Sequence, residues 1–169
     1  MKIFHIVAVS KNNVIGNKGS IPWKNSHDMK RFKELTLNHA VLMGRKTWES
    51  LPKKYRPLLN RYNAILSRTK KESGSPDYDF YTDIDASIQA CKGKGYSELY
   101  VIGGEEIYRQ TKEIVDEIRM TVIEELHEGD AFYPQIKEMG LPPGNTFRCS
   151  YIEDYDGYHF KDYTKDVPF

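Results

Sequence analysis

Four segments of the chain are nearly continuously apolar, which is the pattern of strands that are buried on both faces of a sheet. These segments are residues 2–10, 39–44, 61–67 and 98–104. Apolar residues at helical spacing predict helices between or after them, over roughly residues 26–37, 46–51, 84–91 and 105–111. Because strands alternate with helices, we expect right-handed crossovers and a largely parallel sheet with helices on both faces.

The last third of the chain has a different pattern. Residues 117–126 alternate, with Ile118, Met120 and Val122 on one side of a strand. Residues 146–165 predict two strands joined by a short turn at Asp156-Gly157. The whole pattern indicates an α/β fold: a mostly parallel central sheet of about eight strands, about four flanking helices and a C-terminal antiparallel hairpin. Loops are expected over residues 11–25, 52–60, 68–77 and 127–146.

The composition narrows the class of protein. The chain has 169 residues, of which 39% are hydrophobic and 29% are charged, so we expect residues 1–169 to form a single globular domain. The formal net charge is +1 and both signs are mixed along the chain, which argues against nucleic-acid binding. We expect a monomer because no sustained apolar heptad is present.

The cysteines and the N-terminus bear on location. A protein of this size needs no disulfide, and Cys91 and Cys149 lack partners at zinc-ligand spacing, so we expect free thiols, no metal and a reducing compartment. The apolar N-terminus contains His5, runs into Lys11 and has no small-residue cleavage site, so it is interpreted as a first strand. No apolar run reaches membrane-spanning length. These features predict a cytoplasmic protein without a membrane partner.

One acid stands out in "GSIPWKNSHDMKRF", residues 19–32. With Ser26 as the N-cap of a helix, Asp28, Phe32 and Leu35 fall at positions i, i+4 and i+7 and share one face. This spacing puts a carboxylate on an apolar helix face. The alternative is an acid that stays in water and complements the positive end of the helix dipole.

Two strands end in glycine and run directly into a helix. In "VLMGRKTWESL", Gly44 ends the strand and Arg45 and Lys46 open the helix, where free N–H groups, the helix dipole and two cations favour a phosphate. Thr47 could serve as the N-cap or bond the anion itself. In "LYVIGGEEIY", the glycine pair 103–104 lets a ligand approach the backbone closely.

A third turn combines hydroxyls and cations. In "ILSRTKK", the strand is followed by Ser67, Arg68, Thr69, Lys70 and Lys71, which suit a phosphomonoester such as the 2′-phosphate of NADPH. Taken alone, each of the three turns is also typical of a solvated charged loop. Ligands of open α/β sheets bind outside the carboxyl ends of the strands, so three such turns at strand ends support one another.

The order of these segments resembles the dihydrofolate reductase family over almost the whole chain. "VAVSKNNVIGNKGSIPW" resembles its first strand and mobile active-site loop, and "HDMKRFKELT" resembles its acid-bearing helix. "VLMGRKTWESL" and "LSRT" resemble its phosphate-binding turns, "YVIGGEEIY" its Gly-Gly turn and "HEGDAFYP" its late Gly-Asp loop. The ordered set at these spacings is specific, and the chain is identified as a member of that family.

The resemblance implies that the substrate is a small molecule, 7,8-dihydrofolate, which the enzyme reduces to 5,6,7,8-tetrahydrofolate with NADPH. This reaction supports one-carbon metabolism and thymidylate synthesis, and the resemblance implies that the enzyme is an antifolate target. Hydride passes from nicotinamide C4 to pterin C6, and N5 gains a proton. Asp28 matches the acid that bonds the pterin 2-amino group and N3, Thr121 the hydroxyl that supports this acid and a water, and Trp23 the tryptophan that holds a water. Arg61 matches the arginine that pairs with the α-carboxylate of the glutamate tail, for which a bidentate fork is suited.

The resemblance also implies the walls of the two subsites. The substrate pocket is matched by Ile6, Val7, Ala8, Ile21, Met29, Phe32, Ser50, Leu51, Leu58 and Ile102. The cofactor site is matched by Ala8, Ile15, Gly16, Ser20, Gly44, Arg45, Lys46, Thr47, Leu66, Ser67, Arg68, Thr69, Ile102, Gly103, Gly104, Glu105, Glu106, Ile107 and Tyr108. In the family the peptide between the two glycines is cis.

Three features depart from the family's pattern. Ile21 stands where many bacterial members have Met or Leu, so the gate over the nicotinamide is β-branched. Glu105 replaces a residue that is often small, which puts a side-chain contact with the pyrophosphate in question but not a backbone contact. Residues 24–27 lack the proline that is common before the acid. None of these changes removes a catalytic group.

Two other functions remain open. A related reductase fold acts on ribosylated aminopyrimidines in riboflavin synthesis, but Asp28, Phe32 and Arg61 together fit a pterin with a glutamate tail better. The other is a non-catalytic nucleotide-binding protein on the same fold. The intact set of Asp28, Thr121 and Trp23 argues against it.

Overall fold

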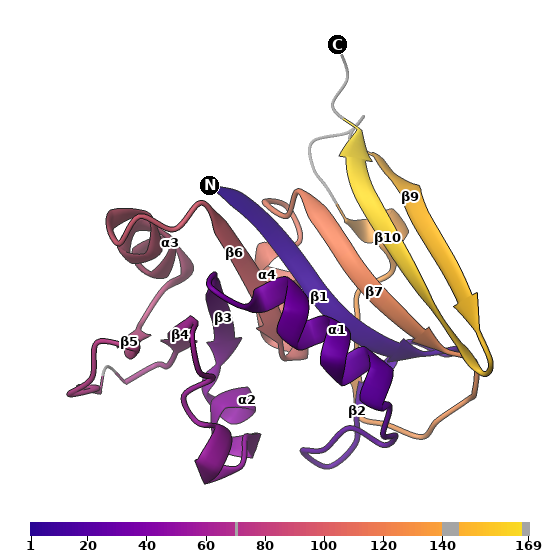
Figure 1. Cartoon of the computed structure of the whole chain (residues 1–169), viewed down its shortest axis with the longest axis horizontal. Helices are drawn as coiled ribbons and strands as arrows, with labels where there is room; N and C mark the ends of the chain where they lie inside the picture. Colours follow the sequence, from indigo (N-terminus) through magenta and orange to yellow (C-terminus); the bar gives the residue numbers. More distant parts are fainter. Residues whose placement is uncertain (70, 140–145, 167–169) are drawn as a thin grey trace.

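An eight-stranded sheet runs through the molecule, and helices lie against both of its faces (Figure 1). The computed structural model describes residues 1–69, 71–139 and 146–166, so Lys70 lies outside the described residues, as do positions 140–145 of the loop expected over 127–146. The strands of the sheet are β1 Lys2–Ser10, β3 Ala40–Gly44, β4 Tyr62–Leu66, β5 Tyr78–Tyr81, β6 Glu98–Gly103, β7 Glu117–Ile123, β9 Thr146–Tyr155 and β10 Tyr158–Asp166. The α-helices are α1 Ser26–Thr36, α2 Arg45–Ser50, α3 Ile84–Gly93 and α4 Glu105–Thr111.

The topology confirms the expected α/β class. The strand order is β5-β4-β3-β6-β1-β7-β10-β9, and every neighbouring pair from β5 to β7 is parallel. β10 is antiparallel to β7 and β9 is antiparallel to β10, as the C-terminal hairpin pattern predicts. The hairpin forms one edge of the sheet in Figure 1.

The alternation of side chains along β1 separates two apolar layers. Phe4 and Ile6 pack with Trp48 of α2 and the apolar side of α1 on one face, whereas Ile3, Val7 and Val9 join α3 and α4 on the other. Burial on both faces is why this strand reads as a continuous apolar run. The face that carries α1 and α2 is the one on which Asp28 lies.

Short elements occur within the expected loops or directly after one of them. β2 Val14–Gly16 pairs with β8 Ala131–Phe132 in a separate two-stranded sheet, and β5 lies at the edge of the main sheet directly after an expected loop. Single 3₁₀ turns form at η1 Lys53–Tyr55 and η2 Ile136–Glu138. Strands of two or three residues have no periodicity to detect, because long-range pairing rather than local pattern fixes them. Among the described residues, no helix is long and apolar enough to cross a membrane.

Candidate active site

The carboxyl ends of three neighbouring strands, β4, β3 and β6, lie side by side. Gly44 at the end of β3 is opposite Leu66 of β4, and Met43 is opposite Gly103 of β6. Ser67 follows Leu66 directly and is buried. The register therefore confirms the expectation that the three turns share the carboxyl edge of the sheet, where open α/β sheets bind ligands.

The two glycine turns face each other. Gly103 has a φ of +116°, and the peptide to Gly104 is cis, as the resemblance implies. A Cβ on Gly103 would lie 3.3 Å from the ring of Tyr108, and one on Gly104 would lie 3.5 Å from Thr47 Oγ1. The backbone at this turn therefore reaches the edge of α2 without an intervening side chain.

The start of α2 differs from one expectation. Gly44 is the N-cap and supplies no side-chain hydrogen bond, so Thr47 is not the N-cap. Thr47 instead lies at the third helical residue, because α2 begins directly at Arg45. The first turn contains no acid, and Arg45 and Lys46 are exposed. This set of donors suits an anionic group.

The side chain of Glu105 bonds another segment of the chain and does not point to a phosphate site. Its Oε1 accepts a hydrogen bond from the backbone N–H of Phe132 at 2.6 Å. The side chain thereby joins α4 to β8, and only its backbone is left to face a phosphate. Glu106 is exposed and accepts from Gln110 Nε2 on the same helix at 2.9 Å.

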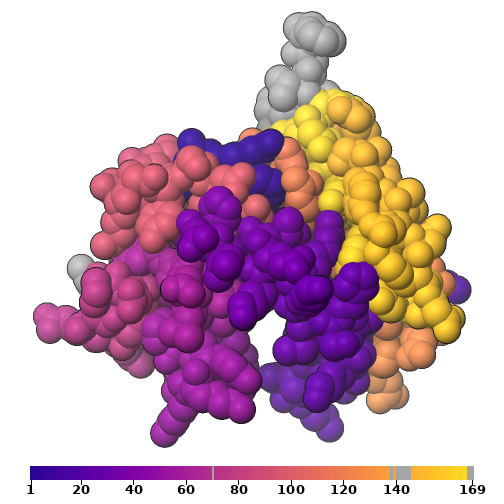
Figure 2. All heavy atoms as spheres, viewed as in Figure 1, coloured from indigo at the N-terminus to yellow at the C-terminus, as the bar shows by residue number. Residues whose placement is uncertain are grey.

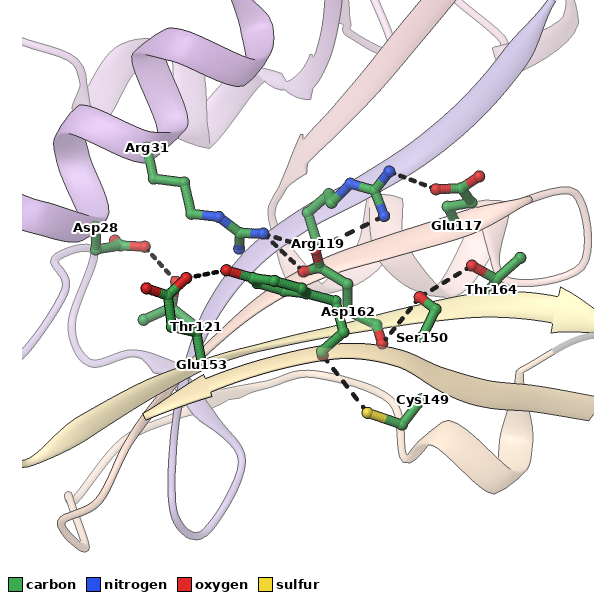
Figure 3. Close-up of polar contacts among 11 residues, drawn as sticks. Asp28, Arg31, Glu117, Arg119, Thr121, Cys149, Ser150, Glu153, Asp162 and Thr164 are labelled. Atoms are coloured by element: carbon green, nitrogen blue, oxygen red, sulfur yellow. Dashed lines mark hydrogen bonds and ion pairs between the residues drawn. The ribbon is translucent and has the colours of Figure 1, made fainter. Parts of the chain in front are cut away.

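The acid of α1 is held from two sides. The helix begins one residue earlier than a Ser26 N-cap predicts, because Asn25 is the N-cap and its Oδ1 accepts from the Asp28 N–H at 2.9 Å. Thr121 of β7 donates its hydroxyl to Asp28 Oδ1 at 2.6 Å. Figure 3 shows this contact between the end of the helix and the sheet. The carboxylate therefore points toward the sheet, as its place on the apolar helix face predicts.

Burial raises the pKa of Asp28 above its ordinary value. The hydrogen bond from Thr121 and the positive charges of Arg31 and His27 lower the pKa and oppose this effect only in part. A carboxyl with a raised pKa in a partly buried site is one of the physical marks of an active site.

Apolar side chains beside Asp28 form one wall. Ile6, Leu51, Leu58 and Ile102 pack in one layer with Phe32. Ile21 and Met29 are 60% and 61% exposed, which is unusual for large apolar side chains and suits a wall that a ligand covers.

Some predicted positions have their side chains elsewhere. Val7, Leu66, Ile107 and Tyr108 pack in the layer of α3 and α4, on the opposite face from Ile6. Among these, Val7 follows directly from strand alternation, because neighbouring residues of β1 point to opposite faces. The Tyr108 hydroxyl donates to the Ile6 carbonyl at 2.7 Å and so still reaches β1 beneath the site.

Arg61 is held by polar groups that the sequence did not mark. Its Nη1 donates to Thr36 Oγ1 at 3.1 Å and its Nε to the Leu59 carbonyl at 2.9 Å. No ion pair joins it to an acid within the described part of the chain. The guanidinium is thus fixed in position and its charge is available to a carboxylate.

Asn63 holds the loop before β4 in place, a role that the local sequence pattern did not indicate. It is fully buried, and its amide donates to the carbonyls of Leu58 and Arg61 while its Oδ1 accepts from the Leu58 N–H, each at 3.0 Å. The loop that carries Leu58 and Arg61 is therefore tied to β4. A polar residue inside the apolar run 61–67 was the available signal.

The loop between β1 and α1 is docked on the late Gly-Asp segment. Asp130 donates its N–H to the Gly16 carbonyl at 3.1 Å, and its carboxylate accepts from the Lys18 N–H at 3.2 and 3.3 Å. Trp23 packs on the ring of His127, with the centroids 5.1 Å apart. Two segments that resemble family loops thus close one side of the site together.

The space-filling view shows a notch that opens between two lobes (Figure 2). One lobe carries the colours of residues near 45–60 and the other those of residues near 10–30, so the notch lies beside α1 and α2. A separate groove of about 620 Å³ lies on the opposite flank of α1, against β9 and β10, and shares no residue with the predicted site. Within the described residues, no group of three or more His, Cys, Asp or Glu side chains is arranged to hold a metal ion.

Fold and candidate site together define an open α/β protein with glycine turns and basic side chains at the carboxyl ends of parallel strands and one acid on a neighbouring helix. A family model described as dihydrofolate reductase matches residues 2–143. The chain belongs to the dihydrofolate reductase family.

Curated relatives agree with the family. The dihydrofolate reductase of Neisseria meningitidis serogroup B is 37% identical over 136 residues, which cover 80% of this chain and 81% of that protein. Dihydrofolate reductase type 6 of Proteus mirabilis is 34% identical over 158 residues, 92% of this chain and 94% of that protein. Bifunctional dihydrofolate reductase-thymidylate synthase 2 of Arabidopsis thaliana is 36% identical over 82% of this chain, which spans only 27% of that longer protein.

Proposed function

We propose that this chain reduces 7,8-dihydrofolate to 5,6,7,8-tetrahydrofolate with NADPH as the reductant. The observation that carries the proposal is the Asp28 carboxylate, which accepts the Thr121 hydroxyl at 2.6 Å beside an apolar layer. This pair fits the 2-amino group and N3 of a pterin, which present hydrogen-bond donors at one edge. Membership of the family and the names of the relatives support the same reaction.

The chemistry needs position more than it needs reactive side chains. NADPH, when bound, supplies the hydride that pterin C6 receives. The protein orients the pterin through Asp28 and the wall of Phe32, Leu51 and Ile102, so that the reacting rings stack with water excluded. Burial raises the pKa of Asp28 above its ordinary value, which helps the site to favour a protonated pterin. Trp23 is proposed to hold the water beside this acid.

The residues present fit the dinucleotide. The donor set at the strand ends is the hydroxyl of Thr47 and the cations Arg45, Lys46 and Arg68, with no acid in the first turn of α2. At Gly103 a Cβ would crowd the Tyr108 ring at 3.3 Å, and the φ of +116° disfavours any residue with a side chain. We assign Arg45, Ser67, Arg68 and Thr69 to the 2′-phosphate side and the Gly103-Gly104 turn to the pyrophosphate side.

The wider setting is proposed with the reaction. We infer a role in one-carbon metabolism and thymidylate synthesis, a cytoplasmic location, a monomeric enzyme formed by one domain over residues 1–169, and a site that antifolates occupy. Arg61, held by Thr36 and Leu59 and without an acidic partner among the described residues, supports recognition of a glutamate tail rather than a ribosylated aminopyrimidine.

The test is NADPH oxidation followed by absorbance, with and without dihydrofolate. Oxidation that depends on dihydrofolate supports the proposal. Oxidation that depends instead on a ribosylated aminopyrimidine would assign the riboflavin-pathway reaction, and NADPH binding without turnover on either substrate would assign a non-catalytic protein.

The variant that tests the proposed role of Asp28 is Asp28→Asn. It keeps the size of the side chain and removes the titratable proton, so we expect turnover at pH 7 to fall by about 10²-fold or more while NADPH binding stays nearly unchanged. Steady-state kinetics and fluorescence titration with NADPH measure the two quantities. Near-normal turnover of this variant would show that Asp28 does not have the assigned role.

A further inference from the structure

A line of alternating charges begins one helical turn from Asp28. Arg31 lies three residues after Asp28 on α1. Its Nη2 donates to both carboxylate oxygens of Asp162 of β10, at 2.9 and 2.7 Å. Asp162 is directly opposite Arg119 of β7, whose Nη1 is 3.8 Å from it, and Arg119 Nη2 reaches Glu117 at 2.5 Å. Figure 3 shows these contacts in sequence from the helix across the sheet.

This line is not an exposed surface network. The side chains of Arg31 and Asp162 are only 15% and 8% exposed. The Arg31 guanidinium also lies over the Phe160 ring, 4.4 Å from its centroid. A guanidinium that is bonded by a carboxylate and packed on an aromatic ring has little freedom to move, and a charge at this depth is weakly screened by salt.

Two parallel contacts therefore fix the same turn of α1 to the same face of the sheet. Asp28 is bonded by Thr121 and Arg31 by Asp162, which is opposite Arg119. Thr121 and Arg119 are two residues apart on β7 and so point to one face. The position of the Arg31 charge relative to the carboxylate is thus set by the β7–β10 register.

We propose that Arg31 is a positioning residue for Asp28, and that Asp162, by holding and partly neutralising its guanidinium, sets the pH range over which the active-site acid works. The inference rests on the proposed role of Asp28. It gives Arg31, which lines the groove beside α1, a function in the reaction at Asp28 three residues earlier on the same helix.

The other groups that face Asp28 come from α1, β7 and α4. His27 lies on the same helix turn, and its Nδ1 is bonded to the Tyr158 hydroxyl at 2.8 Å. Thr121 faces the acid from β7 and does not titrate, whereas Tyr108 of α4 lies close enough that the Asp28 charge contributes to its raised pKa. Arg31 is the fixed cation of this set, and its positive charge lowers the pKa of Asp28.

The direction in which each variant moves the pKa of Asp28 follows from the charge that the variant removes. Arg31→Gln or Arg31→Met removes a cation, so the carboxyl holds its proton to higher pH. Asp162→Asn leaves the cation without its counter-charge, so the carboxyl loses its proton at lower pH. Arg31→Lys keeps the charge and should stay near wild type. A purely structural tie would lower stability in all four variants without moving the titration in opposite directions.

The experiment measures kcat/KM for dihydrofolate from pH 5.5 to 9 and the ¹³C titration of the Asp28 carboxyl, assigned by its loss in Asp28→Asn. We expect the ratio of kcat/KM at pH 8.5 to that at pH 6.5 to rise about two- to tenfold in the Arg31→Gln variant and to fall in Asp162→Asn. Arg148→Gln, which removes the exposed ion pair of Arg148 with Asp166 at 2.7 Å on the same hairpin, is the matched control and should change neither quantity.

Removal of one partner of a buried ion pair can destabilise the fold, so the double variant Arg31→Gln/Asp162→Asn, which leaves no unpaired charge, is included. It should resemble Arg31→Gln. The inference is overturned if the Asp28 carboxyl titrates over the same pH range in the wild type, in Arg31→Gln and in the double variant. Normal turnover of Asp28→Asn would instead overturn the proposed function, and the carboxyl titration would still report whether Arg31 acts on Asp28.

Discussion

The cations assigned to the cofactor differ in how they are held before a ligand binds. Arg45 is paired with Glu49 one helical turn away, at 3.0 and 3.1 Å, and both side chains are about half exposed. Arg68 lies exposed just beyond β4. An exposed pair of this kind stabilises the fold by at most about 1 kcal/mol, so a phosphate can compete for Arg45 at little cost. The assignment of both arginines to the 2′-phosphate is therefore physically consistent.

Loss of both arginines should narrow the preference for NADPH over NADH. In Arg45→Gln/Arg68→Gln we expect KM for NADPH to rise at least about tenfold while KM for NADH changes little, because NADH has no 2′-phosphate to lose a contact. The measurement is kcat/KM with each cofactor at fixed dihydrofolate, with Arg148→Gln as the control for general surface charge. An unchanged preference would refute the assignment.

At the scale of elements, the small β2–β8 sheet joins the loop before α1 to the late Gly-Asp segment. Gly129 allows this contact, since a Cβ there would lie 2.6 Å from the Gly16 carbonyl oxygen and would also collide with Val14. The docked loop carries Gly19 to Trp23, the segment that the family resemblance places over the candidate site. Its position thus depends on a residue more than one hundred positions away in the sequence.

We predict that Gly129→Ala lowers turnover by about fivefold or more through displacement of the loop. The backbone must shift to relieve the contact, which weakens the bonds of Asp130 to Gly16 and Lys18. Amide hydrogen exchange at Lys18 and Asp130, together with kcat, measures the effect. Gly93→Ala is the control, because a Cβ there meets no atom within 4 Å and should leave both readouts unchanged.

At the scale of the whole molecule, a buried histidine joins three distant segments. His5 of β1 is fully buried, with Nε2 2.7 Å from Thr111 Oγ1 and Nδ1 2.8 Å from the Tyr133 hydroxyl. Because Thr111 already donates its hydroxyl to the Ile107 carbonyl, the network assigns the proton to Nε2, and Nδ1 accepts from Tyr133. In the neutral form both ring nitrogens are satisfied.

Burial lowers the pKa of His5 from its ordinary value to about 3. Between pH 6.5 and pH 3 the unfolded chain therefore binds a proton that the folded chain does not, so the free energy of unfolding falls as pH falls through this range, by up to about 1.4 kcal/mol per pH unit. This stability is fully present above pH 6.5. Urea unfolding of wild type and His5→Gln at pH 4.5 to 7.5 tests it, and we expect the variant to have the shallower slope. Parallel pH profiles would contradict the assignment.

The sequence determined the features that depend on local pattern. Apolar runs gave the parallel strands, alternation and Asp156-Gly157 gave the hairpin, and helical spacing placed Asp28 on an apolar face. These hold because the period of buried side chains is set by the geometry of helix and strand. The turns at Gly44, Ser67 and Gly103 were also placed correctly, because the carboxyl ends of parallel strands always share one edge.

Local pattern does not predict contacts between segments far apart in the chain. The family resemblance implied the support of Asp28 by Thr121, 93 residues away, but only the tertiary structure revealed the docking of Gly129 under β2 and the ion pair of Arg31 with Asp162, 131 residues apart. Local pattern carries no information on which polar group meets which, because the register of β7 and β10 brings these partners together. The burial that raises the pKa of Asp28 likewise exists only once the sheet and α1 have packed.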